Sequence, residues 1–204
     1  MRYIDSGDRA PGTGVGAWLE SELDAPENID SFAVQSGYFS LADDGGVVEL
    51  LRRTATAVAS MSFVVGSNAG QTRKADVQRL LRLGASSINV GVVAYANGLF
   101  HPKVYLIQRV DGSRTAFVGS ANFTRRGIEG ANVEAGVVLD EREGDPAAIL
   151  DQVGGAIGRW FRDEPPGFYP VRSSSDVEAL AEIGVLGACQ VVCVSGHQQL
   201  VVRG

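Results

Sequence analysis

The feature that most constrains the fold is the alternation of strand-like and helix-like segments between residues 32 and 93. Apolar runs predict buried strands at 32–39, 61–66 and 88–93. Between them, apolar residues at helical spacing predict one helix from Gly46 and another that Thr72 could cap. This βαβαβ rhythm predicts an α/β fold, with a mainly parallel sheet covered by helices on both faces.

The second half of the chain has a different pattern. Segments 103–110 and 115–118 are predicted strands joined by Asp111-Gly112, a strong hairpin signal. A further strand is expected at 133–139, followed by a helix that starts near Pro146 and ends before Pro165-Pro166-Gly167. With the hairpin included, the predicted sheet is mixed but largely parallel. The segments 176–183 and 191–194 suggest a last helix and a short strand.

Length and composition predict one compact globular domain. The 204 residues are 45% hydrophobic and 21% charged, and 1–170 is expected to form the domain. Residues 171–204 are expected to be a tail, a linker or a dimerisation arm. No apolar run approaches the ~20 residues of a membrane helix, and residues 1–20 lack a leader pattern, so a cytoplasmic protein without membrane contact is expected.

Two cysteines and two histidines leave little room for a structural metal. Cys189 and Cys193 are too few for a disulfide framework. Without clustered histidines they also make a poor zinc site, because zinc usually takes four ligands. We expect both to be packing residues, and we expect no cofactor and no metal ion.

The charge of the chain is unevenly distributed. The net charge of −6 argues mildly against nucleic-acid binding by the whole surface. Between Ala96 and Ile128, however, the sequence contains five basic residues and one acidic residue. The charge of this segment is therefore +4, and the charge of the rest of the chain is −10. Such a segment could bind an anionic substrate, although a merely solvated surface is equally compatible with it. Its candidate substrate-binding residues are Arg109, Arg114, Arg125 and Arg126.

Five polar side chains lie in three short motifs around the hairpin. The motifs are His101-Pro-Lys103, Gly119-Ser-Ala-Asn122 and Asn132-Val-Glu134. Residues i and i+2 of a strand share a face, so His101 and Lys103 should project side by side. The return strand of the hairpin should bring Ser120 and Asn122 to the same sheet edge, where Glu134 starts the next strand. The sequence therefore predicts that these five side chains converge.

Together these groups suit the cleavage of a phosphate diester. A neutral imidazole at His101 can attack phosphorus and form a covalent phosphohistidine. The donors of Lys103, Ser120 and Asn122 can stabilise the non-bridging oxygens, and Glu134 can fix the tautomer of the ring. The leaving oxygen needs an acid, for which His101 of a second copy is a better candidate than His197.

Each of these residues also has an ordinary structural interpretation. A lone histidine is usually a solvated or satisfied polar residue, Gly-Ser-x-Asn is a common turn sequence, Asn122 could cap a helix turn, and Glu134 could be solvated. The joint order of the motifs, separated by a hairpin of suitable length, favours a shared site over coincidence.

These motifs resemble the HxK…GSxN signature of the phospholipase D superfamily. The resemblance covers roughly residues 30–162, and its most specific part is Val118-Gly-Ser-Ala-Asn-Phe-Thr124 with Gly127 and Asn132-Val-Glu-Ala135. Ser36-Gly-Tyr-Phe39 and Val65-Gly-Ser67 add to it. It is closest to the single-motif nucleases that resemble the restriction endonuclease BfiI. It implies a metal-independent phosphodiesterase with one composite site between two subunits. His101 matches the nucleophile, Lys103, Ser120 and Asn122 the phosphate ligands, and Glu134 the carboxylate that orients the histidine.

The chain departs from the full superfamily signature at one position. The Asp expected five residues after Lys103 is replaced by Gln108, which agrees with a subgroup that uses the later Glu. The BfiI-like enzymes carry a DNA-recognition domain after the nuclease domain, and the roughly 40 residues after Phe161 are too few for one. Sequence recognition is therefore expected to come from a separate partner, or to be weak.

The combined expectation is a homodimeric endonuclease that acts on DNA rather than RNA. One alternative is a phospholipase D-type lipid phosphodiesterase, which the single motif and the absence of a membrane-binding stretch make weaker. Another is a catalytically silent scaffold that binds nucleic acid. The presence of all five site residues argues against the scaffold.

Overall fold

A computed structural model describes residues 1–7, 12–41, 46–83 and 88–188 of the chain. The strands are β1 (Arg2–Asp5), β2 (Ile29–Ser36), β3 (Ser60–Gly66), β4 (Ile88–Val93), β5 (Lys103–Arg109), β6 (Arg114–Gly119), β7 (Ala135–Asp140) and β8 (Phe168–Val171). The helices are α1 (Gly14–Leu23), α2 (Gly46–Ala57), α3 (Lys74–Leu81), α4 (Arg125–Ile128), α5 (Ala147–Asp163) and α6 (Ser174–Glu182). Short 3-10 turns lie at Pro26–Asn28, Asn68–Gly70 and Glu141–Glu143.

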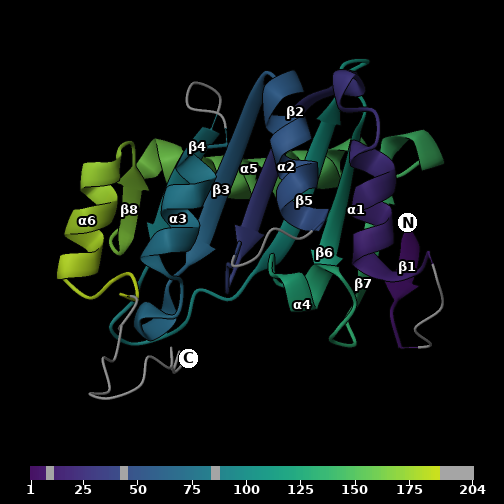
Figure 1. The fold of residues 1–204 in the computed structure, drawn as a ribbon. Coiled ribbons are helices and arrows are strands. Elements are labelled where there is room, and N and C mark those ends of the chain that lie inside the picture. Colours follow the sequence, from purple (N-terminus) through teal and green to yellow (C-terminus); the bar gives the residue numbers. More distant parts are fainter. Residues whose placement is uncertain (8–11, 42–45, 84–87, 189–204) are drawn as a thin grey trace.

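All eight strands form one sheet in the order β1-β7-β6-β5-β2-β3-β4-β8 (Figure 1). The predicted βαβαβ unit is present, since β2, β3 and β4 are parallel and connected through α2 and α3. The other five pairings are antiparallel. The prediction of a largely parallel sheet is therefore wrong, and the sheet is mixed and mostly antiparallel.

The physical reason for this difference lies in the connections. A parallel pair needs a crossover, and the chain supplies helical crossovers only up to β4. After β4 the chain returns through a long loop, so that β5 runs antiparallel to β2, and the hairpin then adds β6 and β7 in alternating directions. The edge strands β1 and β8 were not predicted, because each is four residues long and shows no clear alternation.

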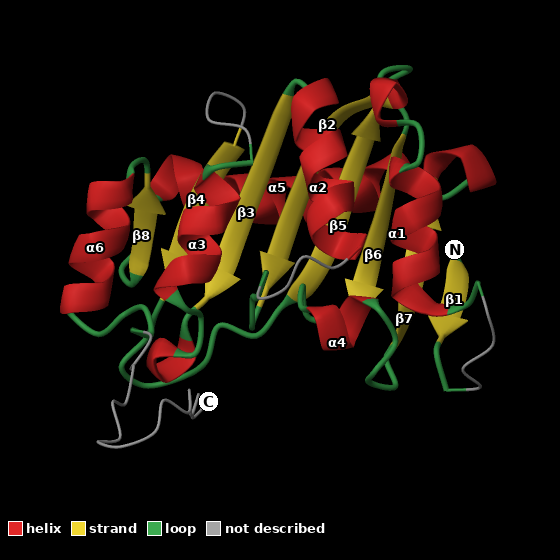
Figure 2. Cartoon of the chain, viewed as in Figure 1, coloured by secondary structure: helices red, strands yellow, loops and turns green. Residues whose placement is uncertain are grey.

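Helices cover both faces of the sheet, as predicted. In Figure 2 the helices α1, α2 and α3 lie in front of the strands and α5 crosses behind them. The larger apolar core lies between the sheet and α1, α2, α3 and α6, and a smaller one holds Ile157 of α5 against Val64 and Phe100. Within the described residues, no helix is long and apolar enough to cross a membrane.

The division drawn at residue 170 does not match the packing of the chain. Strand β8 runs through that boundary and pairs with β4, and Val177, Leu180 and Leu186 are buried in the larger core. The helix predicted at 176–183 is α6, which begins with a capping box between Ser173 and Asp176. The strand expected at 191–194 lies outside the described residues, as do Cys189, Cys193 and His197.

Candidate active site

Strand register brings the three sequence motifs to one edge of the sheet. In the hairpin, Val104 pairs with Val118, so the start of β5 lies beside the end of β6. Gly119 in turn pairs with Gly136 at the start of β7, and Ser36 at the end of β2 pairs with Lys103. This edge, beneath which α4 lies in Figure 1, therefore collects His101, Lys103, Ser120, Asn122 and Glu134.

The backbone before His101 is held by a buried asparagine. The Asn68 side chain accepts a hydrogen bond from the Phe100 amide at 3.1 Å and donates to the carbonyls of Phe100 and Gly37, each at 3.2 Å. Gly37 packs so closely that a Cβ on it would lie 2.9 Å from the Cα of His101. The histidine itself is exposed, and the Tyr38 ring meets its ring edge-on at 5.8 Å between centroids. The main chain of His101 is thus fixed while its imidazole faces solvent.

Lys103 is buried and contacts His101 directly. Its Nζ lies 2.8 Å from His101 Nδ1 and donates to the His101 carbonyl at 2.9 Å, while its side chain is almost excluded from solvent. Burial lowers the pKa of Lys103, and the negative charge of Glu134 partly opposes this shift. The predicted side-by-side placement of His101 and Lys103 is observed.

Ser120 and Glu134 form the second half of the site. The Ser120 hydroxyl donates to Glu134 Oε2 at 2.5 Å and accepts from the Ala135 amide at 3.0 Å. Asn132 donates to Glu134 Oε1 at 3.1 Å, and Ser6 accepts from the Glu134 amide at 2.8 Å. The hydrogen bonds described for the carboxylate thus come from Ser120 and Asn132, while His101 Nδ1 meets Lys103. A direct role of Glu134 in orienting His101 stays a prediction.

Three hydrogen bonds fix the segment that carries Ser120 and Asn122. The Tyr105 hydroxyl donates to the Ala121 carbonyl at 2.7 Å, and Ser36 Oγ accepts from the Phe123 amide at 2.7 Å. The third runs from the Tyr38 amide to Asn122 Oδ1 at 2.9 Å. Ala121 and Phe123 are fully buried. The alternate residues, Ser120 and Asn122, are thereby directed away from the core.

The four arginines expected to bind substrate fall into two groups. Arg125 and Arg126 lie on α4, directly after the Ser120–Asn122 segment, and line a cavity of about 750 Å³ beside the site. Arg125 pairs with Glu129 at 3.0 Å. The Arg126 side chain is exposed and makes no hydrogen bond or ion pair within the described residues.

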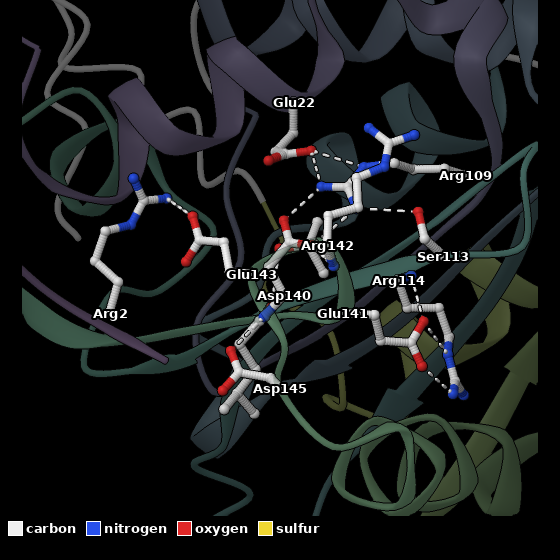
Figure 3. A network of polar contacts seen from close by, with 12 residues as sticks. Arg2, Glu22, Arg109, Ser113, Arg114, Asp140, Glu141, Arg142, Glu143 and Asp145 are labelled. Carbon is white, nitrogen blue, oxygen red and sulfur yellow. Dashed lines mark hydrogen bonds and ion pairs between the residues drawn. The ribbon is translucent and has the colours of Figure 1, made fainter.

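Arg109 and Arg114 do not fit the expectation. Both lie at the turn between β5 and β6, at the other end of these strands from the site. Six residue steps along β5 separate Arg109 from Lys103, or roughly 20 Å. Arg109 is buried and binds Glu22 and Asp140, each at 2.7 Å (Figure 3). Arg114 is held by Glu141 at 2.7 Å and Asp151 at 2.6 Å. Both guanidinium groups are engaged in ion pairs that hold the fold together.

Asn68, Tyr38 and Asn132 belong to the site and were not among the predicted site residues. Tyr38 and Asn132 lie inside quoted motifs, Ser36-Gly-Tyr-Phe39 and Asn132-Val-Glu134, whereas Asn68 follows directly after Val65-Gly-Ser67. A signal was available for Asn68, because a polar residue directly after a buried strand lies at the sheet edge where ligands bind. Among the described residues, no group of three or more His, Cys, Asp or Glu side chains could hold a metal ion.

Solved structures with a similar fold were found at low sequence identity. NucT from Helicobacter pylori is 12% identical, with a TM-score of 0.53 over 79% of this chain and 94% of NucT. Polyphosphate kinase from Porphyromonas gingivalis is 14% identical, with a TM-score of 0.53 over 86% of this chain and 24% of the kinase. A yeast tyrosyl-DNA phosphodiesterase mutant is 15% identical, with a TM-score of 0.41, and this chain spans 28% of its length. The first two similarities support the fold alone.

No curated protein sequence matches the chain. A family model described as "Cardiolipin synthase, PLD-like domain" matches residues 21–153, which include all five predicted catalytic residues. This match confirms the expected superfamily. At the level of the superfamily it also confirms the expected class of enzyme, a phosphodiesterase. The BfiI-like subgroup is not confirmed. The chain belongs to the family of phospholipase D-like domains.

Proposed function

We propose that this protein is a metal-independent endonuclease that cleaves DNA through a covalent phosphohistidine on His101. The observation that carries the proposal is the contact between His101 Nδ1 and Lys103 Nζ at 2.8 Å, beside Ser120, Asn122 and Glu134 at one sheet edge. A nucleophilic ring next to a buried ammonium and several neutral donors suits a phosphate diester, whose non-bridging oxygens carry the negative charge.

The tautomer of His101 determines how the reaction would proceed. While the Lys103 ammonium donates to Nδ1, a neutral ring carries its proton on Nε2 and cannot attack through that atom. A bound phosphate competes for Lys103 through its non-bridging oxygens. In our proposal, Lys103 then turns to the phosphate, the ring proton moves from Nε2 to Nδ1, and Nδ1–H donates a hydrogen bond to Glu134, so that Nε2 is left with a free lone pair.

The covalent step is an in-line displacement followed by hydrolysis. The Nε2 lone pair forms a P–N bond to phosphorus while the P–O bond to the leaving oxygen breaks, and an acid protonates that oxygen. Water then attacks the phosphohistidine, breaks the P–N bond and restores His101. The acid in our proposal is His101 of a second subunit, across a twofold axis. In such a dimer, the second subunit would cover the exposed side chains of Leu99 and Val133, which lie close to His101 and Glu134 in the sequence.

A trapping experiment tests this proposal. Rapid acid-free quenching with a 32P-labelled diester should leave label on the wild-type protein and none on His101→Ala. A labelled protein that is stable to base and labile to acid would identify the P–N bond. Absence of label under single-turnover cleavage would contradict the covalent mechanism, and absence of both label and cleavage would favour the silent scaffold.

Binding should also depend on salt. If the site contacts the nucleic-acid backbone, log affinity should fall linearly with log salt, with a slope near −0.9 for each phosphate neutralised in duplex DNA. Two symmetry-related sites in a dimer should give about twice the slope of one. Sequence recognition, in this proposal, is supplied by a separate partner. Binding that ignores salt would contradict a contact with the phosphate backbone.

The description of the matching family favours a second candidate, a lipid phosphodiesterase. Its chemistry at phosphorus would be the same, and only the groups on the two ester oxygens would differ. Parallel assays of plasmid nicking and of hydrolysis of anionic phospholipid vesicles separate the two candidates. Our proposal expects nicking without vesicle hydrolysis, and the reverse result would establish the lipid substrate.

A further inference from the structure

The cavity of about 750 Å³ at α4 adjoins the catalytic edge of the sheet. Its walls come from three places, namely the end of β2 with Tyr38, the segment of Asn122, and α4 with the loop that follows it. The volume lies within the ~300–1,000 Å³ range of pockets that enclose small organic ligands. The cavity, which we name the Tyr38 cavity, is therefore large enough for a chemical group attached to the reacting phosphate.

Two residues link the Tyr38 cavity to the reacting centre. The Tyr38 ring lines the cavity and also lies edge-on to the His101 ring, with 5.8 Å between centroids. The Oδ1 atom of Asn122 is occupied by the Tyr38 amide at 2.9 Å, which leaves the Asn122 amide protons for a phosphate oxygen. A phosphate bound by His101 and Asn122 would place one of its two ester substituents at the mouth of the cavity.

The walls of the cavity combine a flat aromatic ring with a free positive charge. Tyr38 is half-buried, and its backbone, not its ring, makes the hydrogen bonds with Asn122 and Ser36, so the ring is available for stacking. Arg126 is exposed, and its guanidinium makes no hydrogen bond or ion pair within residues 1–7, 12–41, 46–83 and 88–188. Among the other charged lining residues, Arg125 and Glu129 pair with each other. The net charge of the lining is therefore positive.

We infer that the Tyr38 cavity binds the nucleoside next to the scissile phosphate, with its base on the Tyr38 ring and the following phosphate at Arg126. This inference rests on the proposed nuclease function and names the form of its substrate. A base that is paired and stacked in a duplex cannot enter a cavity beside its own phosphate. The preferred substrate is accordingly a single strand, or a duplex that is locally open.

The test compares two diesters with the same leaving group. One is methyl p-nitrophenyl phosphate, and the other is thymidine p-nitrophenyl phosphate, as its 3′ and 5′ isomers. Wild-type protein should favour one thymidine isomer over the methyl ester in kcat/KM by about ten-fold, the scale of one base–aromatic stack. Tyr38→Leu should reduce that ratio toward one, and Tyr38→Phe should preserve it because the ring remains.

A second measurement follows binding without turnover. A labelled 12-nucleotide single strand should bind the wild-type protein more tightly than the duplex of the same sequence, and Tyr38→Leu should remove the difference. Arg126→Gln should raise the Kd for the single strand by about three-fold, within the range of one exposed ion pair. The matched control is Arg159→Gln, which changes an exposed arginine on α5 and should leave binding unchanged.

The outcomes separate the inference from the function on which it rests. Hydrolysis of all esters at equal rates, or equal affinity for single strand and duplex, overturns the Tyr38 cavity as a nucleoside site and leaves the phosphodiesterase intact. If none of the esters is hydrolysed, the proposed function is overturned. A single-strand preference that depends on Tyr38 would in that case still support the Tyr38 cavity as a nucleoside site. Hydrolysis of phospholipid vesicles that depends on Tyr38 would assign the cavity to a lipid and overturn the inference.

Discussion

The side chain of Asn68 makes two hydrogen bonds with the backbone of Phe100, one to its amide at 3.1 Å and one to its carbonyl at 3.2 Å. Phe100 directly precedes His101, and Asn68 follows the end of β3. The end of β3 therefore fixes the backbone position of His101. Both residues are buried, and the amide of Asn68 is the polar group that satisfies this turn of the main chain. Asn68 is therefore a positioning residue for His101.

Asn68→Ala should lower kcat by roughly 10²-fold with little change in KM, because a displacement of about 1 Å at a nucleophile has an effect of that size. The free energy of unfolding should also fall by about 1–3 kcal/mol, since buried backbone groups lose their partners. The matched control is Thr72→Val, which removes a buried hydrogen bond to the Gly66 carbonyl at the same strand end. It should reduce stability similarly and leave kcat close to wild type. Equal losses of kcat in both variants would show that Asn68 contributes to stability and does not position His101.

Glu134→Gln should lower the rate by about 10²-fold and shift the pH profile. Burial already lowers the pKa of Lys103, and the charge of Glu134 opposes that shift. Removing the charge lowers the pKa further, so the protonated form of Lys103 is lost at a lower pH. The alkaline limb of kcat/KM should therefore move to lower pH. DNA binding should not weaken, because a negative charge has been removed. Glu143→Gln, at an exposed site far along the sheet, is the control, and a profile identical to wild type would contradict the role of Glu134.

Arg109→Ala should destabilise the fold by about 3–5 kcal/mol in urea denaturation, because Glu22 and Asp140 would lose their cation in a poorly solvated site. Burial alone would raise the pKa of Asp140, but hydrogen bonds from Arg109 and the Arg142 amide outweigh it and lower that pKa. A lowered carboxyl pKa stabilises the fold above about pH 4 and loses this effect as the pH falls further. The difference between wild type and variant should therefore shrink in acid.

The contrast between two arginines completes that test. Arg126→Ala should change the free energy of unfolding by no more than about 0.5 kcal/mol and weaken DNA binding, since the side chain is exposed. Arg109→Ala should leave the affinity unchanged wherever the protein is folded. A loss of affinity in folded Arg109→Ala would restore the idea that this arginine contacts substrate.

Cleavage should persist in excess EDTA, because the proposed mechanism uses a histidine nucleophile and cationic or neutral donors for the phosphate oxygens. Plasmid nicking before and after dialysis against chelator measures this directly. Activity that disappears with chelator and returns on addition of Mg²⁺ would contradict the mechanism.

Mixing wild-type and His101→Ala subunits tests whether one site is shared. After subunit exchange into random dimers, a mixed dimer would lack either the nucleophile or the acid. Activity should fall with the square of the wild-type fraction, so that an equal mixture keeps about one quarter of it. Independent sites would retain about one half. A linear dependence with confirmed exchange would refute the shared site and return attention to other acids, His197 among them.

The sequence determined those parts of the protein that depend on local structure. The Asp111-Gly112 turn fixes the register of β5 and β6, and this register alone brings Lys103 and Gly119 to the same end of the hairpin. The side-by-side placement of His101 and Lys103 follows from the two-residue period of a strand. The crossovers through α2 and α3 could also be predicted, because helical spacing and periodicity are local patterns too.

Only the tertiary structure decided the contacts between segments that are distant in the chain. Strand order, which no local pattern encodes, decides three of these contacts. They are the antiparallel pairing of β5 with β2, the hydrogen bonds between Asn68 and Phe100, and the burial of Arg109 between Glu22 and Asp140. A charged residue is written identically in the sequence whether it pairs inside the fold or faces solvent. The physical reason is that backbone propensity and turn geometry act over a few residues, whereas burial and ion pairing are set by whichever surfaces the folded chain brings together.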